Sequence, residues 1–219
     1  MQPYKVPAGP AQAEVTDRRS RFIGQVWPVT SSAEAMQCVE SLRRLHYQAR
    51  HVVFALRLHD EGAVRSSDDG EPQGTAGAPL LELLERREQS DCLVTVVRYF
   101  GGVLLGTGGL LRAYTQAGRQ ALEAAGELWR VPAVQCEMRA DYAAYGRLTA
   151  LPAAFGGETS DIRYADDVRW TVRLPALCRD AFARSEALRE AGIAAPAWEP
   201  APPLSWTEAE FEARKQLFL

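Results

Sequence analysis

Hydrophobic residues follow two different periods along the first 130 residues, and this pattern predicts strands that alternate with helices. Residues 21–29, 51–58 and 92–99 are short runs rich in β-branched and aromatic side chains, which is typical of strands. The run 92–99 is the most continuous, so we expect it in the centre of a sheet. Between these runs, apolar residues return at helical spacing after a capping box that opens at Ser31, and again over 110–125. The first half is therefore predicted to be an α/β domain.

The apolar pattern changes near Val131 and Pro132 and predicts a second, smaller domain. Its elements follow the order strand, helix, strand, strand, helix, strand, which is the ferredoxin-like βαββαβ pattern. The prolines within 200–203 are expected to break the chain, and a terminal helix is expected from Ser205. The predicted strands cover 134–142, 158–164, 168–174 and 193–198, and the predicted helices cover 142–153 and 177–191.

Together the two halves predict an α+β protein, divided into residues 1–131, residues 132–204 and a helical tail of residues 205–219. A chain of 219 residues can hold two small domains. Its 47% hydrophobic and 24% charged residues are ordinary for a globular protein. The net charge of −3 argues against bulk electrostatic binding of duplex nucleic acid. A local basic groove remains possible because nearly all of the 25 basic residues are arginines.

The chain carries no sequence signal for a membrane, a metal or a redox centre. No apolar run approaches the roughly 20 residues that span a bilayer, and the N-terminus lacks the apolar core of a signal peptide. The four cysteines are widely spaced and form no C-x-x-C pair. We therefore expect a cytoplasmic protein with no membrane partner, metal or cofactor.

The segment 98–109 contains a glycine-rich loop between a predicted strand and a predicted helix. Glycine lets a ligand approach the backbone closely, and the free N–H groups at a helix start attract anions. The loop matches neither a Walker P-loop nor G-x-G-x-x-G. Either it binds an anion such as a backbone phosphate, or its glycines only permit tight packing. The loop residues concerned are Gly101, Gly102, Gly106, Thr107, Gly108 and Gly109.

An arginine and two aromatic residues precede that loop. Tyr99 and Phe100 are expected on opposite faces of the strand, and a ring beside Arg98 is a usual platform for stacking a base or an aromatic side chain. Alternatively, one ring fills the core and Arg98 pairs with Asp68 or Glu71.

The segment 66–78 is acidic and rich in glycine. Asp68, Asp69 and Glu71 are close enough in sequence to bind Mg²⁺ or to share acid and base roles. They also fit a plain turn in which aspartate caps local N–H groups or pairs with Arg50 or Arg98. His51 is a candidate base for nearby hydroxyl groups, or a structural histidine held by hydrogen bonds.

In combination, these segments resemble the YigZ/IMPACT family, in its bacterial two-domain form. The resemblance rests on residues 20–23, 49–51, 67–77 and 97–114, which occur in the family's order across roughly residues 15–125. It implies an N-terminal domain like domain 2 of ribosomal protein S5 and a ferredoxin-like domain similar to one in elongation factor G. Eukaryotic relatives regulate translation by competing for the activator of an initiation-factor kinase, a partner not expected in bacteria. The family brings no agreed catalytic activity.

We therefore expect a non-catalytic, translation-associated protein that binds RNA, the ribosome or a translation factor between the two loops. Arg50, Arg98 and Arg112 would contact phosphate, and Tyr99 or Phe100 would stack. One alternative is a small hydrolase or transferase acting on a phosphorylated or peptide substrate, with Mg²⁺ on the acidic cluster and His51 assisting. Another is a docking module for a basic protein. The predicted binding residues are Arg50, His51, Asp68, Asp69, Glu71, Arg98, Tyr99, Phe100, Gly101, Gly102, Gly106, Thr107, Gly108, Gly109 and Arg112, and no catalytic or metal-binding residue is predicted.

Overall fold

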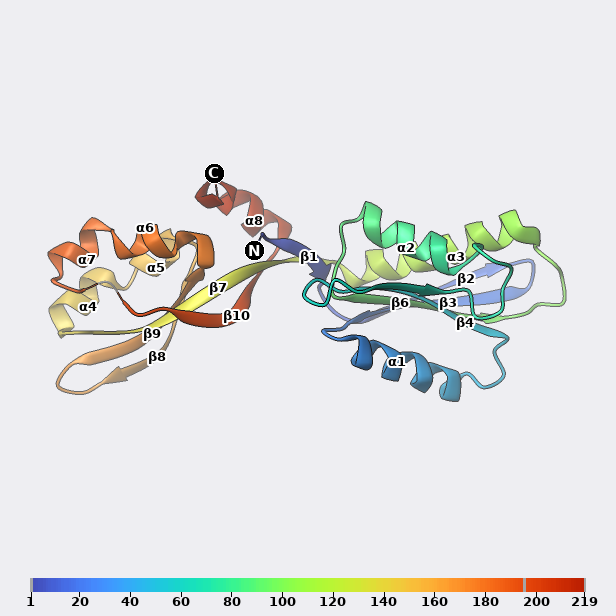
Figure 1. The fold of residues 1–219 in the computed structure, drawn as a ribbon, viewed down its shortest axis with the longest axis horizontal. Coiled ribbons are helices and arrows are strands. Elements are labelled where there is room, and N and C mark those ends of the chain that lie inside the picture. The colour runs from blue at the N-terminus through green and yellow to red at the C-terminus, as the bar shows by residue number, and fades with distance from the viewer. Residues whose placement is uncertain (1, 195, 219) are drawn as a thin grey trace. The chain divides into compact units, whose positions relative to one another are not determined.

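A computed structural model describes residues 2–194 and 196–218 of the chain. The chain divides into two compact units, one of residues 4–128 and one of residues 129–218 together with residues 2–3. Each unit combines a sheet with helices (Figure 1). The predicted two-domain α+β architecture is confirmed.

The first unit is built on a sheet in which each strand is antiparallel to its neighbours. The strand β6 lies in its centre, and its residues from Cys92 to Arg98 are all buried. Burial on both faces explains why this strand appears in the sequence as a continuous apolar run. The strands, in sheet order, are β2 (Ala11–Asp17), β3 (Ser20–Pro28), β6 (Cys92–Tyr99), β4 (His51–Arg57) and β5 (Val64–Ser67), while β1 (Tyr4–Pro7) forms a bridge to Gln89.

Helices cover both faces of this sheet (Figure 1). The helix α1 (Ser32–Leu45) lies on one face and begins at the predicted cap, where the Ser31 hydroxyl accepts from the Glu34 N–H. The helices α2 (Gly77–Arg86) and α3 (Gly106–Ala125) lie on the other face and pack against each other. The main core of the unit lies between this helix pair and the sheet.

Glycines allow α3 to approach the sheet closely. A Cβ atom on Gly24 of β3 would lie 2.3 Å from the backbone oxygen of Ala117 in α3. A Cβ atom on Gly118 of the same helix would lie 2.4 Å from the Leu80 side chain in α2. Because real side chains do not approach this closely, the position of α3 depends on these two glycines.

The second unit has the predicted ferredoxin-like topology. Its strands lie in the order β10, β7, β9, β8, and all neighbours are antiparallel. Its helices lie together on one face of this sheet (Figure 1), over a core that includes Trp170 and Phe182. The elements are β7 (Glu127–Ala140), α4 (Tyr142–Leu148), α5 (Leu151–Ala154), β8 (Glu158–Tyr164), β9 (Val168–Pro175), η1 (Ala176–Cys178), α6 (Arg179–Ala183), α7 (Glu186–Glu190), β10 (Glu199–Trp206), α8 (Glu208–Arg214) and η2 (Lys215–Phe218).

The last strand lies later in the chain than predicted. The described residues of 193–198 lie outside the sheet, position 195 lies outside the described residues, and the strand is β10. The prolines within 200–203 do not break it, because β10 pairs only with β7 and its register shifts between Ala201 and Leu204. Proline is tolerated at a sheet edge or a bulge, where no ladder N–H is needed. The terminal helix therefore begins later, at a capping box formed by Thr207 and Glu210.

Other boundaries also differ from the prediction. The helix expected over 142–153 is divided into α4 and α5, and the helix expected over 177–191 is divided into η1, α6 and α7. The helix α3 begins at Gly106 rather than at residue 110, so half of the predicted glycine loop is its first turn. Propensity placed these glycines in a loop, but the tertiary structure includes them in a helix.

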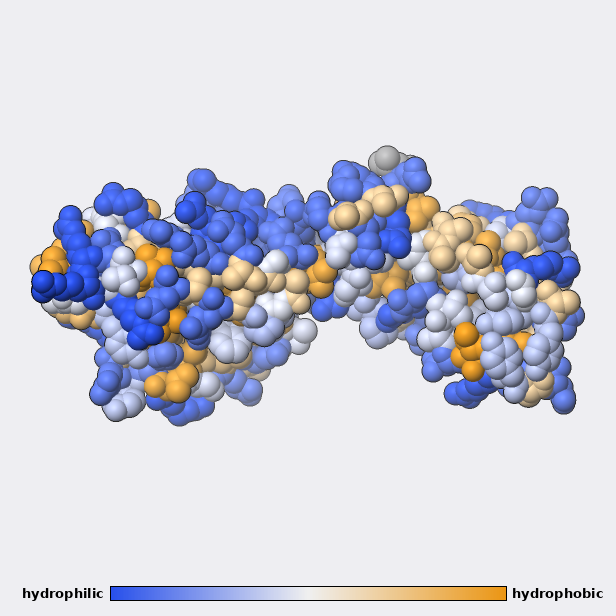
Figure 2. Space-filling view, turned by 180° about the vertical axis from the view of Figure 1, so that it is seen from behind, coloured by the Kyte–Doolittle hydropathy of each residue, from blue (hydrophilic) through white to orange (hydrophobic). Residues whose placement is uncertain are grey.

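None of the helices within the described residues is long and apolar enough to cross a membrane. In the view of Figure 2, the surface is largely hydrophilic, and the exposed hydrophobic residues form small groups.

Two glycine-to-alanine substitutions test the close approach of α3. We expect Gly24→Ala to lower the free energy of unfolding by about 1–3 kcal/mol, because its Cβ would meet rigid backbone. The matched control is Gly146→Ala in α4, where no atom lies within 4 Å of the added Cβ; it should raise stability by about 0.5–1 kcal/mol. Urea unfolding measures both, and equal stability of Gly24→Ala and the wild type would contradict the packing described.

Candidate functional site

The two loops singled out in the sequence meet around one cavity of the first unit. The cavity has a volume of about 480 Å³. The loop between β5 and α2 forms one wall, and the end of β6 with the start of α3 forms another. Apolar side chains supply much of the lining. The lining residues are Arg50, His51, Gly70, Glu71, Pro72, Arg98, Phe100, Leu104, Leu105, Gly106, Thr107 and Leu110.

A buried polar network fixes the two walls to each other. The guanidinium of Arg98, a residue that is only 4% exposed, forms a short charge-assisted hydrogen bond to Glu71 Oε1. The hydroxyl of Tyr114, from α3, donates to the same oxygen over 2.8 Å. The ring of Tyr114 meets Phe22 edge to face at a centroid distance of 5.1 Å. One carboxylate oxygen thus connects the acidic loop, β6 and α3, and the pairing of Arg98 with Glu71 that the sequence left open is observed.

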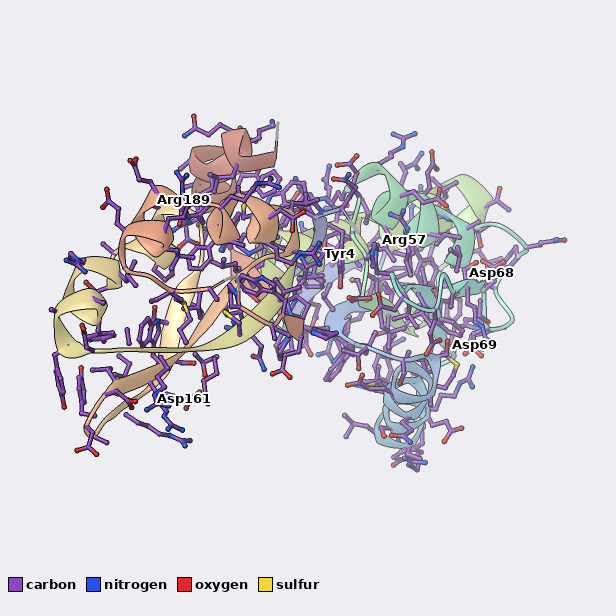
Figure 3. The ribbon with its side chains drawn as sticks, turned by 60° about the vertical axis from the view of Figure 1, so that its left-hand side comes forward. Tyr4, Arg57, Asp68, Asp69, Asp161 and Arg189 are labelled. Atoms are coloured by element: carbon purple, nitrogen blue, oxygen red, sulfur yellow. The ribbon has the colours of Figure 1, made fainter. Side chains whose placement is uncertain are left out.

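Asp68 stabilises the acidic loop from within and caps α2. Its carboxylate accepts from the N–H groups of Gly74, Ala76 and Gly77 at 2.8–3.0 Å. Burial by itself raises the pKa of this carboxyl, but the three backbone hydrogen bonds outweigh it and hold the pKa below its usual value. Asp68 is therefore the capping aspartate of a turn (Figure 3).

Asp69 connects the same loop to β4. Its carboxylate accepts from the Val52 N–H over 2.7 Å and from the Arg43 guanidinium over 2.6 Å. Its own carbonyl lies 2.7 Å from Nδ1 of His51. A carbonyl can only accept, so Nδ1 of His51 donates and Nε2 points toward Glu71 Oε1, 3.7 Å away. Asp69 pairs with Arg43, not with Arg50 or Arg98, and Figure 3 shows Asp68 and Asp69 on the same loop.

The two aromatic residues at the end of β6 separate as predicted. Tyr99 packs on the α1 side, where its hydroxyl lies 2.8 Å from Nδ1 of His46. Phe100 lines the cavity instead, with the guanidinium carbons of Arg50 and Arg98 at 5.5 Å and 5.6 Å from its ring centroid. Phe100 is thus the ring available to a ligand of this cavity.

The glycines beyond Phe100 permit a close approach at Gly101 and positive φ values at Gly102 and Gly106. A Cβ on Gly101 would lie 2.0 Å from the Arg19 backbone, and the Gly101 N–H donates to the Ser20 hydroxyl over 3.1 Å. Gly102 and Gly106 have φ values of 84° and 69°, which favour glycine. The N-cap residue of α3, Leu105, has an apolar side chain that caps no N–H group of the helix. Gly106 and Thr107, the first two residues of α3, line the cavity.

The cavity brings together only part of the predicted site. It contains Arg50, His51, Glu71, Arg98, Phe100, Gly106 and Thr107. Asp68, Asp69, Tyr99, Gly101, Gly102, Gly108, Gly109 and Arg112 are not among its lining residues. Arg112 lies on the exposed side of α3 in a shallow depression with Leu111 and Arg119.

Sequence reasoning missed the apolar lining and the tyrosine beneath it. Leu104, Leu105 and Leu110 lie between or beside glycines, and the sequence pattern assigned the ligand contacts to those glycines instead. Tyr114 follows Leu110 by four residues, so both lie on the same face of α3. This helical spacing was the available signal.

The carboxylates of the acidic loop are already hydrogen-bonded within the protein. Both oxygens of Asp68 and of Asp69 already accept hydrogen bonds from the protein, and Glu71 is bonded to Arg98 and Tyr114. Within residues 2–194 and 196–218, no group of three or more acidic, histidine or cysteine side chains is placed to hold a metal ion.

Comparison with known proteins shows the family. Residues 18–122 match the Impact N-terminal domain, and residues 138–185 match a domain of unknown function, DUF1949. The IMPACT family member YigZ of Escherichia coli (strain K12) is 34% identical over 179 residues, covering 80% of this chain and 88% of that protein. The chain belongs to the IMPACT family. The member YvyE of Bacillus subtilis is 35% identical over 62% of this chain and 63% of its own length.

A solved structure supports the two-domain fold. A crystal structure described as that of a hypothetical protein aligns with a TM-score of 0.60 and 31% identity, covering 92% of this chain and 98% of that one. The human protein IMPACT is 32% identical over 96 residues, which is 42% of this chain and 30% of that protein. The resemblance to the YigZ/IMPACT family that the sequence indicated is therefore confirmed.

Removing the charge of Glu71 tests the buried network. We expect Glu71→Gln to lower the free energy of unfolding by about 3–5 kcal/mol, because Arg98 would keep a buried charge without its counter-ion. The control is Arg43→Ala, which removes a partly exposed pair with Asp69 and should cost at most about 1 kcal/mol. Denaturant titration compares the two variants, and equal small losses would mean that the buried pair does not hold the loops.

Alkaline titration tests the position of Tyr114. Burial first, and then the charge of Glu71, raise the pKa of its hydroxyl far above the usual value of 10.0. The folded chain keeps this proton while the unfolded chain releases it, so stability from this group is present below about pH 10 and is lost as the pH rises above it. Thermal unfolding between about pH 9 and 11 should show a smaller loss of stability for Tyr114→Phe than for the wild type. Identical slopes would argue against a buried hydroxyl.

Proposed function

We propose that this protein is a non-catalytic, translation-associated regulatory protein whose first unit binds a component of the translation machinery at the cavity between the two loops. Family membership supports the translation context, since eukaryotic relatives in this family regulate translation. The observation that carries the binding role is the Glu71–Arg98–Tyr114 network. It stabilises a preformed cavity, and preformed sites lose less entropy on binding.

The lining of the cavity favours recognition over chemistry. Arg50 is exposed, stacks on Phe100, and forms no ion pair within the described residues. It lies at the same cavity as the uncapped first turn of α3, and both attract negative charge. Phe100 and the leucines beside it offer apolar contact. A ligand that combines an anionic group with an apolar or planar group fits both features.

The alternative of a metal-dependent hydrolase has less support. Its proposed carboxylates are on Asp68, Asp69 and Glu71. The first two accept from backbone N–H groups and Arg43, Glu71 accepts from Arg98 and Tyr114, and a metal would have to displace such bonds. If Mg²⁺ raised the melting temperature of the wild type but not that of Asp69→Asn, the result would support the hydrolase alternative.

Co-sedimentation with purified ribosomes tests the proposal. We expect the wild-type chain to pellet with ribosomes at low salt, and Arg50→Ala and Phe100→Ala each to reduce the bound fraction at least about fivefold, equivalent to roughly 1 kcal/mol. The matched control is Arg147→Ala, which removes an exposed arginine of α4 in the other unit. Equal binding by all four proteins, or none by the wild type, would refute the proposal.

A further inference from the structure

The hairpin between β2 and β3 has an unusual tip. Asp17 pairs with Ser20, so the turn consists of Arg18 and Arg19 alone. Both have positive φ values, 43° and 67°. Two-residue hairpin turns with this backbone strongly favour Asn-Gly, because side chains with a Cβ are strained there. Two arginines thus occupy positions that the backbone geometry disfavours.

Nothing within the fold explains the choice of arginine at these positions. Both residues are exposed, and neither side chain forms an ion pair or hydrogen bond within residues 2–194 and 196–218. Their neighbour Arg21, in contrast, pairs with Glu14 over 2.7 Å. A local rule that is broken without a structural gain is expected where side chains serve a function.

The hairpin tip lies directly against the glycine loop. The Arg19 backbone occupies the space that a Cβ on Gly101 would need, and the Ser20 hydroxyl accepts from the Gly101 N–H. Beyond this contact the loop carries two apolar side chains into solvent, with Leu104 80% exposed and Val103 40% exposed. Figure 2 shows hydrophobic and strongly hydrophilic atoms side by side at the end of this unit.

We call the exposed residues of the hairpin turn and of the loop that it contacts at Gly101 the arginine–leucine tip: Arg18, Arg19, Val103 and Leu104, with the loop's Leu104 also lining the cavity beside Arg50 and Phe100. Its guanidinium groups are complementary to negative charge on a partner. Its exposed leucine favours an apolar pocket, as in the apolar core of a protein interface, because bases stack on aromatic side chains and not on aliphatic ones.

We infer that the arginine–leucine tip is a docking surface for a protein partner whose own surface combines acidic residues with an apolar pocket or stripe. The inference rests on the proposed function and deepens it by naming the partner class. The arginines orient the partner through charge, and Leu104 supplies apolar surface that the partner would bury.

Synthetic probes test this partner class by fluorescence anisotropy. The first probe is a labelled peptide of alternating glutamate and leucine, the second a glutamate-only peptide of equal length, and the third an oligouridylate of equal charge. We expect the first probe to bind at least tenfold more tightly than the other two. Tighter binding of the oligouridylate would assign the surface to RNA and overturn the inference, as would no binding of the first probe.

The double variant Arg18→Asn/Arg19→Gly separates binding from folding. It installs the preferred turn residues, so the melting temperature should rise by about 2–4 °C. Binding of the glutamate–leucine peptide should nevertheless weaken at least tenfold. Leu104→Ser should weaken it at least fivefold without lowering the melting temperature. Unchanged binding in either variant overturns the inference.

Two controls match these variants elsewhere on the chain. Leu45→Ser removes a leucine of α1 that is 71% exposed, and Arg147→Asn removes an exposed arginine of α4. Both should bind the peptide as the wild type does. In ribosome co-sedimentation, loss with Phe100→Ala but not with Arg18→Asn/Arg19→Gly would overturn this inference alone, and loss with neither would overturn the proposed function as well.

Discussion

The buried ion pair between Glu71 and Arg98 is the interaction on which the candidate site depends. It joins a loop that follows β5 to the end of β6, and Tyr114 extends the connection to α3. Removing two charges from water is costly, and the cost is offset only when the geometry is good and the remaining polar atoms are bonded. Here one carboxylate oxygen accepts from two donors, so the network requires these three elements to keep one arrangement.

The aspartates of the acidic loop hold the backbone in place by accepting hydrogen bonds from its N–H groups. Asp68 satisfies N–H groups at the start of α2, and Asp69 satisfies an N–H group at the start of β4. Left unpaired, such buried groups would destabilise the loop. The loop for which the sequence allowed Mg²⁺ binding or acid and base roles therefore forms one wall of the cavity. The negative charge of the cluster is paired inside the protein, whereas Arg50 and the two arginines of the hairpin tip form no ion pair within the described residues.

A rigid cavity beside an exposed, strained hairpin tip suits a protein that recognises a surface. The cavity offers Phe100 and the first turn of α3, while the tip offers arginines and Leu104. Preorganised walls favour affinity, and exposed unpaired arginines favour rapid, charge-directed association. The second unit, with its ferredoxin-like sheet, contains none of the residues of this network.

The sequence by itself determined the strands β3, β4 and β6 and the helices α1 and α3 of the first unit, the βαββαβ order of the second, and the family, because apolar periodicity, capping residues and long ordered motifs are local properties of the chain. It also marked the two loops. It misplaced β10, since proline tolerance depends on whether a strand lies at a sheet edge. Only the tertiary structure decided that Glu71 is the partner of Arg98, that Phe100 rather than Tyr99 lines the cavity with Arg50, and that the Arg18–Arg19 turn meets Gly101. Each of these is a contact between residues far apart in the chain, and local pattern carries no information about such contacts.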